Sequence, residues 1–152
     1  MRKRLHFDAP TDLYVTDACV VVCFDHRYAN TWRKFLKRIG TRVTDTIVIA
    51  GGVKSLASAD DESAKGFVLD QIRASMRLHG TGRVILIAHA DCGAYGGIAL
   101  FGGSASAEAE HHWQELERAA VAIREALPAL QTECYFMNFD GVWESEALPA
   151  AS

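Results

Sequence analysis

The chain has 152 residues, of which 49% are apolar and 23% are charged, and its formal net charge is −3. This length and composition are typical of one globular domain with its own hydrophobic core, and they exclude a mainly disordered chain. Acidic residues outnumber basic ones, so nucleic acid is not an expected partner, and no apolar run approaches the roughly 18 residues that a membrane span needs.

Residues 1–16 are expected to form an N-terminal arm ahead of the domain. The arm begins with a basic stretch at residues 1–4, and because no apolar segment follows it we expect no secretory signal. A cytoplasmic location is therefore predicted, where the 4 cysteines stay reduced or bind metal. The domain itself is expected over residues 17–144, followed by a C-terminal tail at residues 145–152.

The first third of the chain predicts two strands with a helix between them. Residues 18–23 are apolar throughout, and continuous rather than alternating apolarity indicates a strand buried on both faces. The helix is expected to begin with a cap at Asn30 or Thr31 and to end at Gly40. Its apolar residues at helical spacing are Trp32, Phe35, Leu36 and Ile39. The second strand is predicted at residues 46–49, just before Ala50-Gly51-Gly52.

The alternation of strand and helix continues to the end of the chain. A helix is predicted from about residue 61 to residue 79, and an apolar strand at residues 83–88. Glycines between residues 93 and 103 indicate turns, after which a long helix ends near Pro128 and a last strand covers residues 133–139. The apolar face of the long helix consists of Trp113, Leu116, Ala120, Ile123 and Leu127. This order predicts a single α/β domain with a mainly parallel sheet of four to five strands and helices on both faces.

Three candidate metal ligands follow the predicted strands. Cys23 ends the first strand, and His89 and Cys92 follow the strand at residues 83–88. The carboxyl ends of parallel strands meet at one edge of a sheet, so these residues are expected to converge. Two thiolates and one imidazole suit zinc and leave a fourth position open for chemistry, with Asp25 as the nearest further donor.

Buried cysteines are common and usually inert, so each candidate also has a simpler interpretation. Cys19 and Cys134 lie within apolar strands and are expected to be small core residues. His89 could be a hydrogen-bonded histidine at a strand end, and His26 is expected to be an exposed loop residue. The spacing from Cys23 to Arg27 is too short for a phosphatase-like phosphate loop.

The paired motifs resemble the zinc signature of the β-class carbonic anhydrases. The resemblance rests on Cys23-x-Asp25-x-Arg27, on His89-Ala90-Asp91-Cys92-Gly93-Ala94 and on the Ala-Gly turn at residue 50, and it covers residues 17 to 144. It implies one Zn²⁺ per chain on Cys23, His89 and Cys92, and a catalytic pair in which Arg27 holds Asp25 away from the metal. It also implies reversible hydration of carbon dioxide to bicarbonate by zinc-bound hydroxide.

Two other functions remain open at this point. Family relatives that hydrolyse carbon disulfide or carbonyl sulfide use the same zinc ligands, so the width of the pocket decides the substrate. A noncatalytic zinc-containing domain for binding or sensing would instead have Asp25 closing the site. The resemblance further implies a homodimer, and the large apolar side chains Trp32, Phe101, Trp113 and Trp143 in a small domain also favour association.

Overall fold

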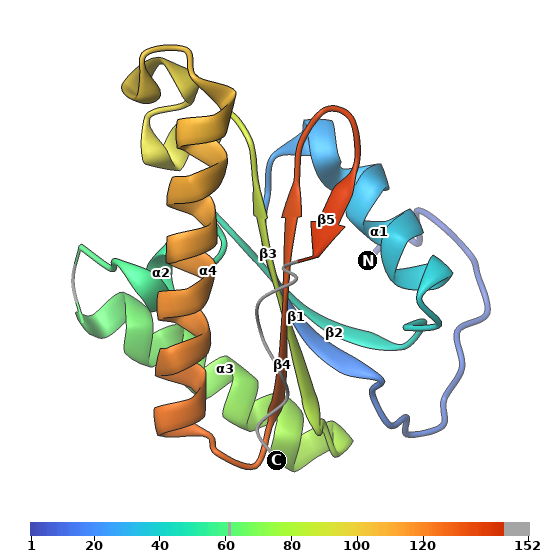
Figure 1. Ribbon diagram of the computed structural model, residues 1–152. Coiled ribbons are helices and arrows are strands. Elements are labelled where there is room, and N and C mark those ends of the chain that lie inside the picture. The colour runs from blue at the N-terminus through green and yellow to red at the C-terminus, as the bar shows by residue number, and fades with distance from the viewer. Residues whose placement is uncertain (61, 145–152) are drawn as a thin grey trace.

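Five strands form one twisted sheet in the order β2-β1-β3-β4-β5 (Figure 1). This arrangement comes from a computed structural model that describes residues 1–60 and 62–144. The strands are β1 (Ala18–Cys23), β2 (Thr44–Ile49), β3 (Arg83–His89), β4 (Gln131–Met137) and β5 (Val142–Glu144). The first four are parallel and β5 returns antiparallel to β4. The predicted α/β fold with a mainly parallel sheet is therefore confirmed.

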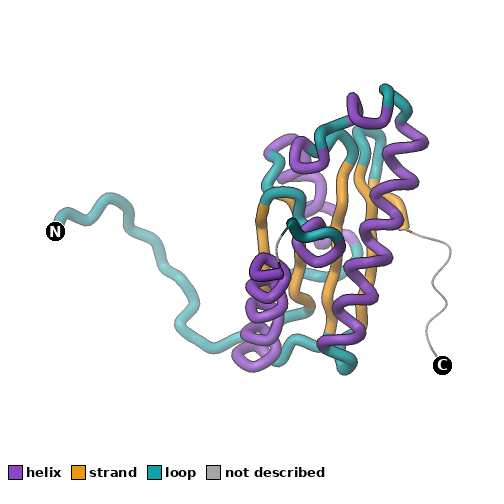
Figure 2. Tube along the Cα trace, turned by 90° about the vertical axis from the view of Figure 1, so that its left-hand side faces the viewer, coloured by secondary structure: helices purple, strands orange, loops and turns teal. Residues whose placement is uncertain are grey.

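Helices cover both faces of the sheet, as Figures 1 and 2 show. They are α1 (Ala29–Arg38), α2 (Lys54–Ala57), α3 (Glu62–His79) and α4 (Ala105–Ala126). Helix α1 packs on one face, and the other three pack on the opposite face. Three short 3₁₀ turns complete the described elements: η1 (His26–Tyr28), η2 (Gly93–Tyr95) and η3 (Ile98–Phe101).

The central strands are buried on both faces, which explains their continuous apolar sequences. Val21 and Leu86 point into the larger core cluster with helices α3 and α4. Val20 and Ile85, one residue away in each strand, point the other way and pack against Trp32 of α1. Because alternate side chains of a strand face opposite sides, only apolar residues satisfy both cores.

Several predicted boundaries and elements differ from the structure. Strand β4 ends at Met137 rather than at residue 139, and the chain then turns back as β5, which was not predicted. Helix α1 begins at Ala29, without a capping side chain, because the 3₁₀ turn η1 leads directly into it. Neither Asn30 nor Thr31 is its cap. The short helix α2 was not predicted either, and residue 61, the expected start of the next helix, lies outside the described residues.

The N-terminal residues run away from the domain as an extended segment (Figure 2). The segment meets the domain at Tyr14, whose hydroxyl donates to Asp45 at 2.9 Å, and at Thr16, whose backbone N–H donates to the carbonyl of His79 at 3.1 Å. Among residues 1–60 and 62–144, no helix has the length and apolar character required to cross a membrane. The predicted tail at residues 145–152 lies outside the described residues.

Gly52 lies in the turn after β2, where the backbone passes very close to the end of β1. Its φ is +53°, and a Cβ there would lie 2.7 Å from the backbone nitrogen of Cys23 and 2.9 Å from the carbonyl carbon of Val22. Both a left-handed conformation and a close backbone approach favour glycine. This turn therefore sets the position of the end of β1, and with it the position of Cys23.

We expect Gly52→Ala to lower the free energy of unfolding by about 2 kcal/mol or more, because neither contacting atom belongs to a side chain that can move aside. Gly66→Ala is the matched control. Gly66 lies inside α3, and a Cβ added there would meet no neighbouring atom within 4 Å, so alanine should stabilise the fold by about 0.5–1 kcal/mol. Urea unfolding of both variants measures the difference, and equal effects would contradict the close approach at Gly52.

Candidate metal centre

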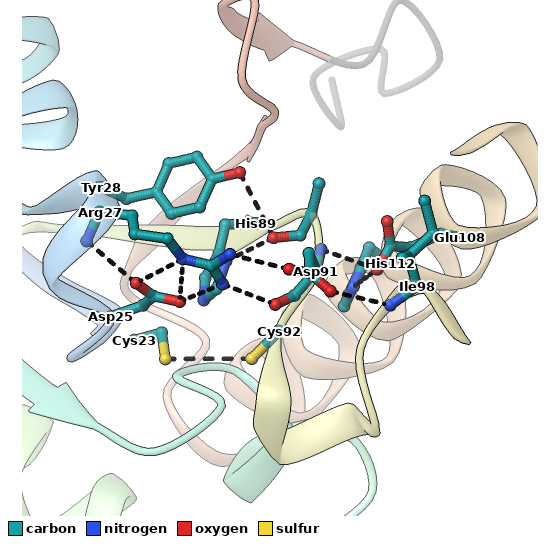
Figure 3. A network of polar contacts seen from close by, with 11 residues as sticks. Cys23, Asp25, Arg27, Tyr28, His89, Asp91, Cys92, Ile98, Glu108 and His112 are labelled. Atoms are coloured by element: carbon teal, nitrogen blue, oxygen red, sulfur yellow. Dashed lines mark hydrogen bonds and ion pairs between the residues drawn. The ribbon is translucent and has the colours of Figure 1, made fainter. Parts of the chain in front are cut away.

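Cys23, His89 and Cys92 lie together at the carboxyl edge of the sheet (Figure 3). Cys23 is the last residue of β1 and His89 the last residue of the neighbouring strand β3, while Cys92 follows β3 by three positions. All three are buried, and their ligand atoms lie within 4.8 Å of one another. The structure thus brings together the three residues that the sequence singled out, and as a group they could hold a metal ion.

One ring nitrogen of His89 faces the two sulfurs and has no hydrogen-bond partner. Its Nδ1 lies 2.8 Å from the carbonyl oxygen of Ala90. A carbonyl only accepts hydrogen bonds, so Nδ1 carries the proton and Nε2 keeps its lone pair. Nε2 is buried and has no hydrogen-bond partner. Because leaving a buried polar atom unpaired is costly, this lone pair fits a metal ion better than it fits an apolar core.

The two sulfurs of Cys23 and Cys92 lie 3.9 Å apart. Two sulfurs bound tetrahedrally to one zinc at about 2.3 Å each are separated by about 3.8 Å, so the pair is already at a suitable distance. The hydrogen bond between them lowers the pKa of Cys23 and raises that of Cys92. A cation that binds this pair would displace thiol protons, so metal affinity is expected to rise with pH.

Asp25 and Arg27 form a two-pronged ion pair beside the cluster (Figure 3). The guanidinium Nε donates to Asp25 at 3.1 Å and Nη2 donates to Asp25 Oδ2 at 2.6 Å. The backbone N–H of Arg27 also donates to Oδ1 at 3.0 Å, so that Asp25 caps η1. The Arg27 side chain lowers the pKa of Asp25 from 3.8 to about 2, and the carboxylate is therefore ionised at neutral pH.

Two acidic residues near this pair were not identified from the sequence. Asp91 accepts a hydrogen bond from Arg27 Nη1 at 2.8 Å through Oδ2, and Glu108 of α4 accepts the backbone N–H of Asp91 at 2.7 Å. Asp91 lies inside the H-x-x-C motif, and its position between two candidate ligands could have indicated that it belongs to the site. Glu108 offered none, because its approach depends on how α4 packs against the loop.

Helix α4 carries a buried histidine behind the loop that follows β3. His112 is fully buried against Tyr95 and Phe136, and both of its ring nitrogens lack a hydrogen-bond partner. Burial lowers its pKa from 6.5 to about 4, so the ring stays neutral at physiological pH. Its Nε2 is 4.0 Å from Glu108, the residue that braces the loop.

An open cleft of about 780 Å³ leads to the cluster. Its walls include the 3 residues Phe24, Ala50 and Ala94 as well as the Asp25–Arg27 pair. His26 is exposed at the cleft, as predicted, whereas Cys19 and Cys134 are buried in the core away from it. Burial raises the pKa of each of these two thiols to about 12, as expected of inert core cysteines.

The comparisons with known proteins agree with the motifs. A family model described as "Putative carbonic anhydrase" matches residues 14–147. The chain belongs to this carbonic anhydrase family. An uncharacterized protein of Rickettsia bellii is 26% identical over 128 residues, which are 82% of this chain and 78% of that protein.

Solved carbonic anhydrases share the fold of this family member at low sequence identity. A β-carbonic anhydrase of Trichomonas vaginalis has a TM-score of 0.56 at 14% identity, covering 91% of this chain and 87% of that one. A carbonic anhydrase of Glaciozyma antarctica has a TM-score of 0.55 at 18% identity, covering 87% and 83%. The apo form of a carbon disulfide hydrolase also has a TM-score of 0.55, at 13% identity, covering 89% and 82%. At such identities the likeness shows the fold alone.

If Cys23, His89 and Cys92 hold a zinc ion, His89→Ala should remove most of it, because two thiols without the imidazole leave too few donors. Zinc per chain, measured by elemental analysis after dialysis against zinc-free buffer, is expected to fall from about one to well below one half. Cys134→Val is the matched control, since it removes a buried sulfur outside the cluster and should leave the zinc content unchanged. Full occupancy in His89→Ala, or metal loss in Cys134→Val, would show that the ligand set is wrong.

Proposed function

We propose that this carbonic anhydrase family member catalyses the reversible hydration of carbon dioxide to bicarbonate, with one Zn²⁺ held by Cys23, His89 and Cys92. The observation that carries the proposal is the arrangement at the sheet edge. Three buried donors face one another, and the nearest carboxylate, Asp25, is held by Arg27 instead of joining them. A site built only for structure would be closed by a fourth ligand and would need no arginine beside it.

When bound, zinc would lower the pKa of a coordinated water to about 7 and so supply a nucleophile at neutral pH. The residues of the chain prepare the site for this chemistry. The carbonyl of Ala90 fixes the ring of His89 with Nε2 toward the cluster. Cys23 and Cys92 supply negative charge, and their burial keeps competing water away from the sulfurs.

Asp25 orients the attacking oxygen. Because its pKa is about 2, this side chain is a carboxylate throughout the neutral range and can only accept hydrogen bonds. It therefore favours a nucleophile that still carries a proton to donate, and it directs the lone pair of that oxygen into the cleft. Arg27 keeps the carboxylate in that position, since a free carboxylate this close to a divalent cation would coordinate it.

Carbon disulfide or carbonyl sulfide is the second candidate substrate. Both are linear molecules attacked at carbon, and one solved protein of similar fold is a carbon disulfide hydrolase. The apolar part of the cleft wall, at Phe24, Ala50 and Ala94, is compatible with either substrate. A noncatalytic zinc domain is less well supported, because Asp25 is paired with Arg27.

Stopped-flow hydration of carbon dioxide, run together with a zinc count, tests the proposal. The zinc-loaded protein is expected to be active, and Arg27→Ala should lose at least about tenfold in kcat/KM with its zinc content unchanged, because Asp25 is then free to bind the metal. Arg33→Ala is the matched control, since Arg33 is an exposed arginine on α1 outside the cleft. An inactive zinc-loaded protein would contradict the proposed reaction, and a fully active Arg27→Ala enzyme would contradict the role of Arg27.

We also propose that the chain forms a homodimer that covers its exposed apolar side chains. Phe24 at the cleft is 65% exposed, and Phe139 in the turn between β4 and β5 is 71% exposed. The N-terminal segment adds Leu5 and Phe7, both exposed. Large exposed apolar side chains are typical of surfaces that meet a partner, and a two-fold symmetric contact is the commonest arrangement.

Light scattering at micromolar concentration should therefore give about twice the mass of one 16.6 kDa chain. Removing residues 1–8 tests the contribution of the N-terminal segment, and we expect the shortened chain to dissociate at a higher concentration. A particle of single-chain mass with full activity would rule out a cleft that needs a second copy.

A further inference from the structure

Asp91 holds the guanidinium of Arg27 on the side opposite Asp25 (Figure 3). Its Oδ2 accepts a hydrogen bond from Nη1 at 2.8 Å, and its backbone carbonyl accepts one from Nη2, also at 2.8 Å. The backbone of Asp91 itself lies in the left-handed region, with φ at +53°. Among the described residues other than glycine, Asp91 is the only one with a positive φ.

The surrounding loop fixes Asp91 in this strained conformation. The buried carboxylate of Glu108 accepts its backbone N–H at 2.7 Å, and the N–H of Ile98 donates to its Oδ1 at 3.1 Å. Gly97 leaves room for that bond, since a Cβ at Gly97 would lie 2.8 Å from Asp91 Oδ1. A left-handed backbone is unfavourable for a residue other than glycine, and such strain is typical of functional sites.

We propose that Asp91 is the positioning residue that keeps Arg27 on Asp25 and thereby keeps the fourth metal position open. The inference rests on the proposed function and adds a residue to it. Arg27 is a long side chain whose exposed fraction is 45%. Holding such a side chain in one rotamer costs conformational entropy. The two hydrogen bonds to Asp91 hold the guanidinium of Arg27 in the orientation in which it pairs with Asp25.

A competing effect of Asp91 has the opposite sign. Its negative charge shares the positive charge of Arg27 with Asp25, so removing that charge alone would strengthen the Arg27–Asp25 attraction. The groups are partly exposed, however, and the attraction between exposed charges is screened by water and salt. Geometry therefore outweighs charge here. Asp91→Asn removes the negative charge and keeps an oxygen acceptor on the side chain. Asp91→Gly removes both the charge and the side-chain acceptor, and it relieves the backbone strain.

Azide binding to the Co²⁺-loaded protein tests the proposal, because azide occupies an open metal position and changes the visible spectrum of Co²⁺. If Asp25 occupies that position in nine molecules of ten, the apparent azide affinity falls about tenfold. We expect at least this loss in Asp91→Gly and in Asp91→Ala, and a loss of less than about threefold in Asp91→Asn. Asp91→Ala is a second variant in case glycine loosens the loop. Thermal melting establishes that each variant is folded.

The double variant Asp25→Asn/Asp91→Gly separates closure by Asp25 from general damage to the loop. An asparagine side chain is a poor metal ligand, so the double variant should bind azide as tightly as Asp25→Asn alone. Three results would overturn the proposal: azide affinity in Asp91→Gly and Asp91→Ala equal to or tighter than that of the unaltered protein; tighter binding in Asp91→Asn; or a loss that persists in the double variant. Failure of the unaltered Co²⁺ protein to bind azide would instead overturn the open site itself, and with it the proposed function.

Discussion

The parallel pairing of β1 with β3 is the constraint on which the rest of the molecule depends. The register places Val22 opposite Ile87, so that the ends of both strands, and with them Cys23 and His89, reach the same edge of the sheet. Both strands are buried on both faces, which means that neither can slip by one residue without moving its apolar side chains into the wrong core. The hydrophobic core therefore fixes the positions of Cys23 and His89 at the candidate site.

Unbalanced negative charge is the second organising feature of the site. The two thiols of Cys23 and Cys92 line the same cleft as Asp25 and Asp91, and Arg27 is the guanidinium that both carboxylates contact. Such a cluster favours a divalent cation. It also explains why one arginine makes so many hydrogen bonds, since it compensates two acids while leaving the sulfurs and the imidazole free.

The sequence predicted the parts of the molecule that depend on local pattern. Continuous apolarity identified β1 and β3, and the type and spacing of Cys23, His89 and Cys92 identified the cluster. The parts that were missed depend on contacts between distant segments. Strand β5 is only three residues long and is defined by its pairing with β4, and Glu108 reaches Asp91 only because α4 packs beside the loop. The left-handed backbone of Asp91 could not be predicted from the sequence either, because an aspartate, unlike a glycine, does not indicate a positive φ.

The placement of the three donors has a consequence for the way the folded chain fluctuates. Cys23 and His89 end the two strands at the centre of the sheet, which belong to the region where local opening costs nearly as much as global unfolding. Cys92 lies on a loop, where opening costs much less, although the hydrogen bonds of Asp91 raise that cost. Donor atoms with unequal local stability would give an ion held by these three residues an ordered route of dissociation, in which Cys92 would leave first and the two strand-end donors would hold until the sheet itself opened.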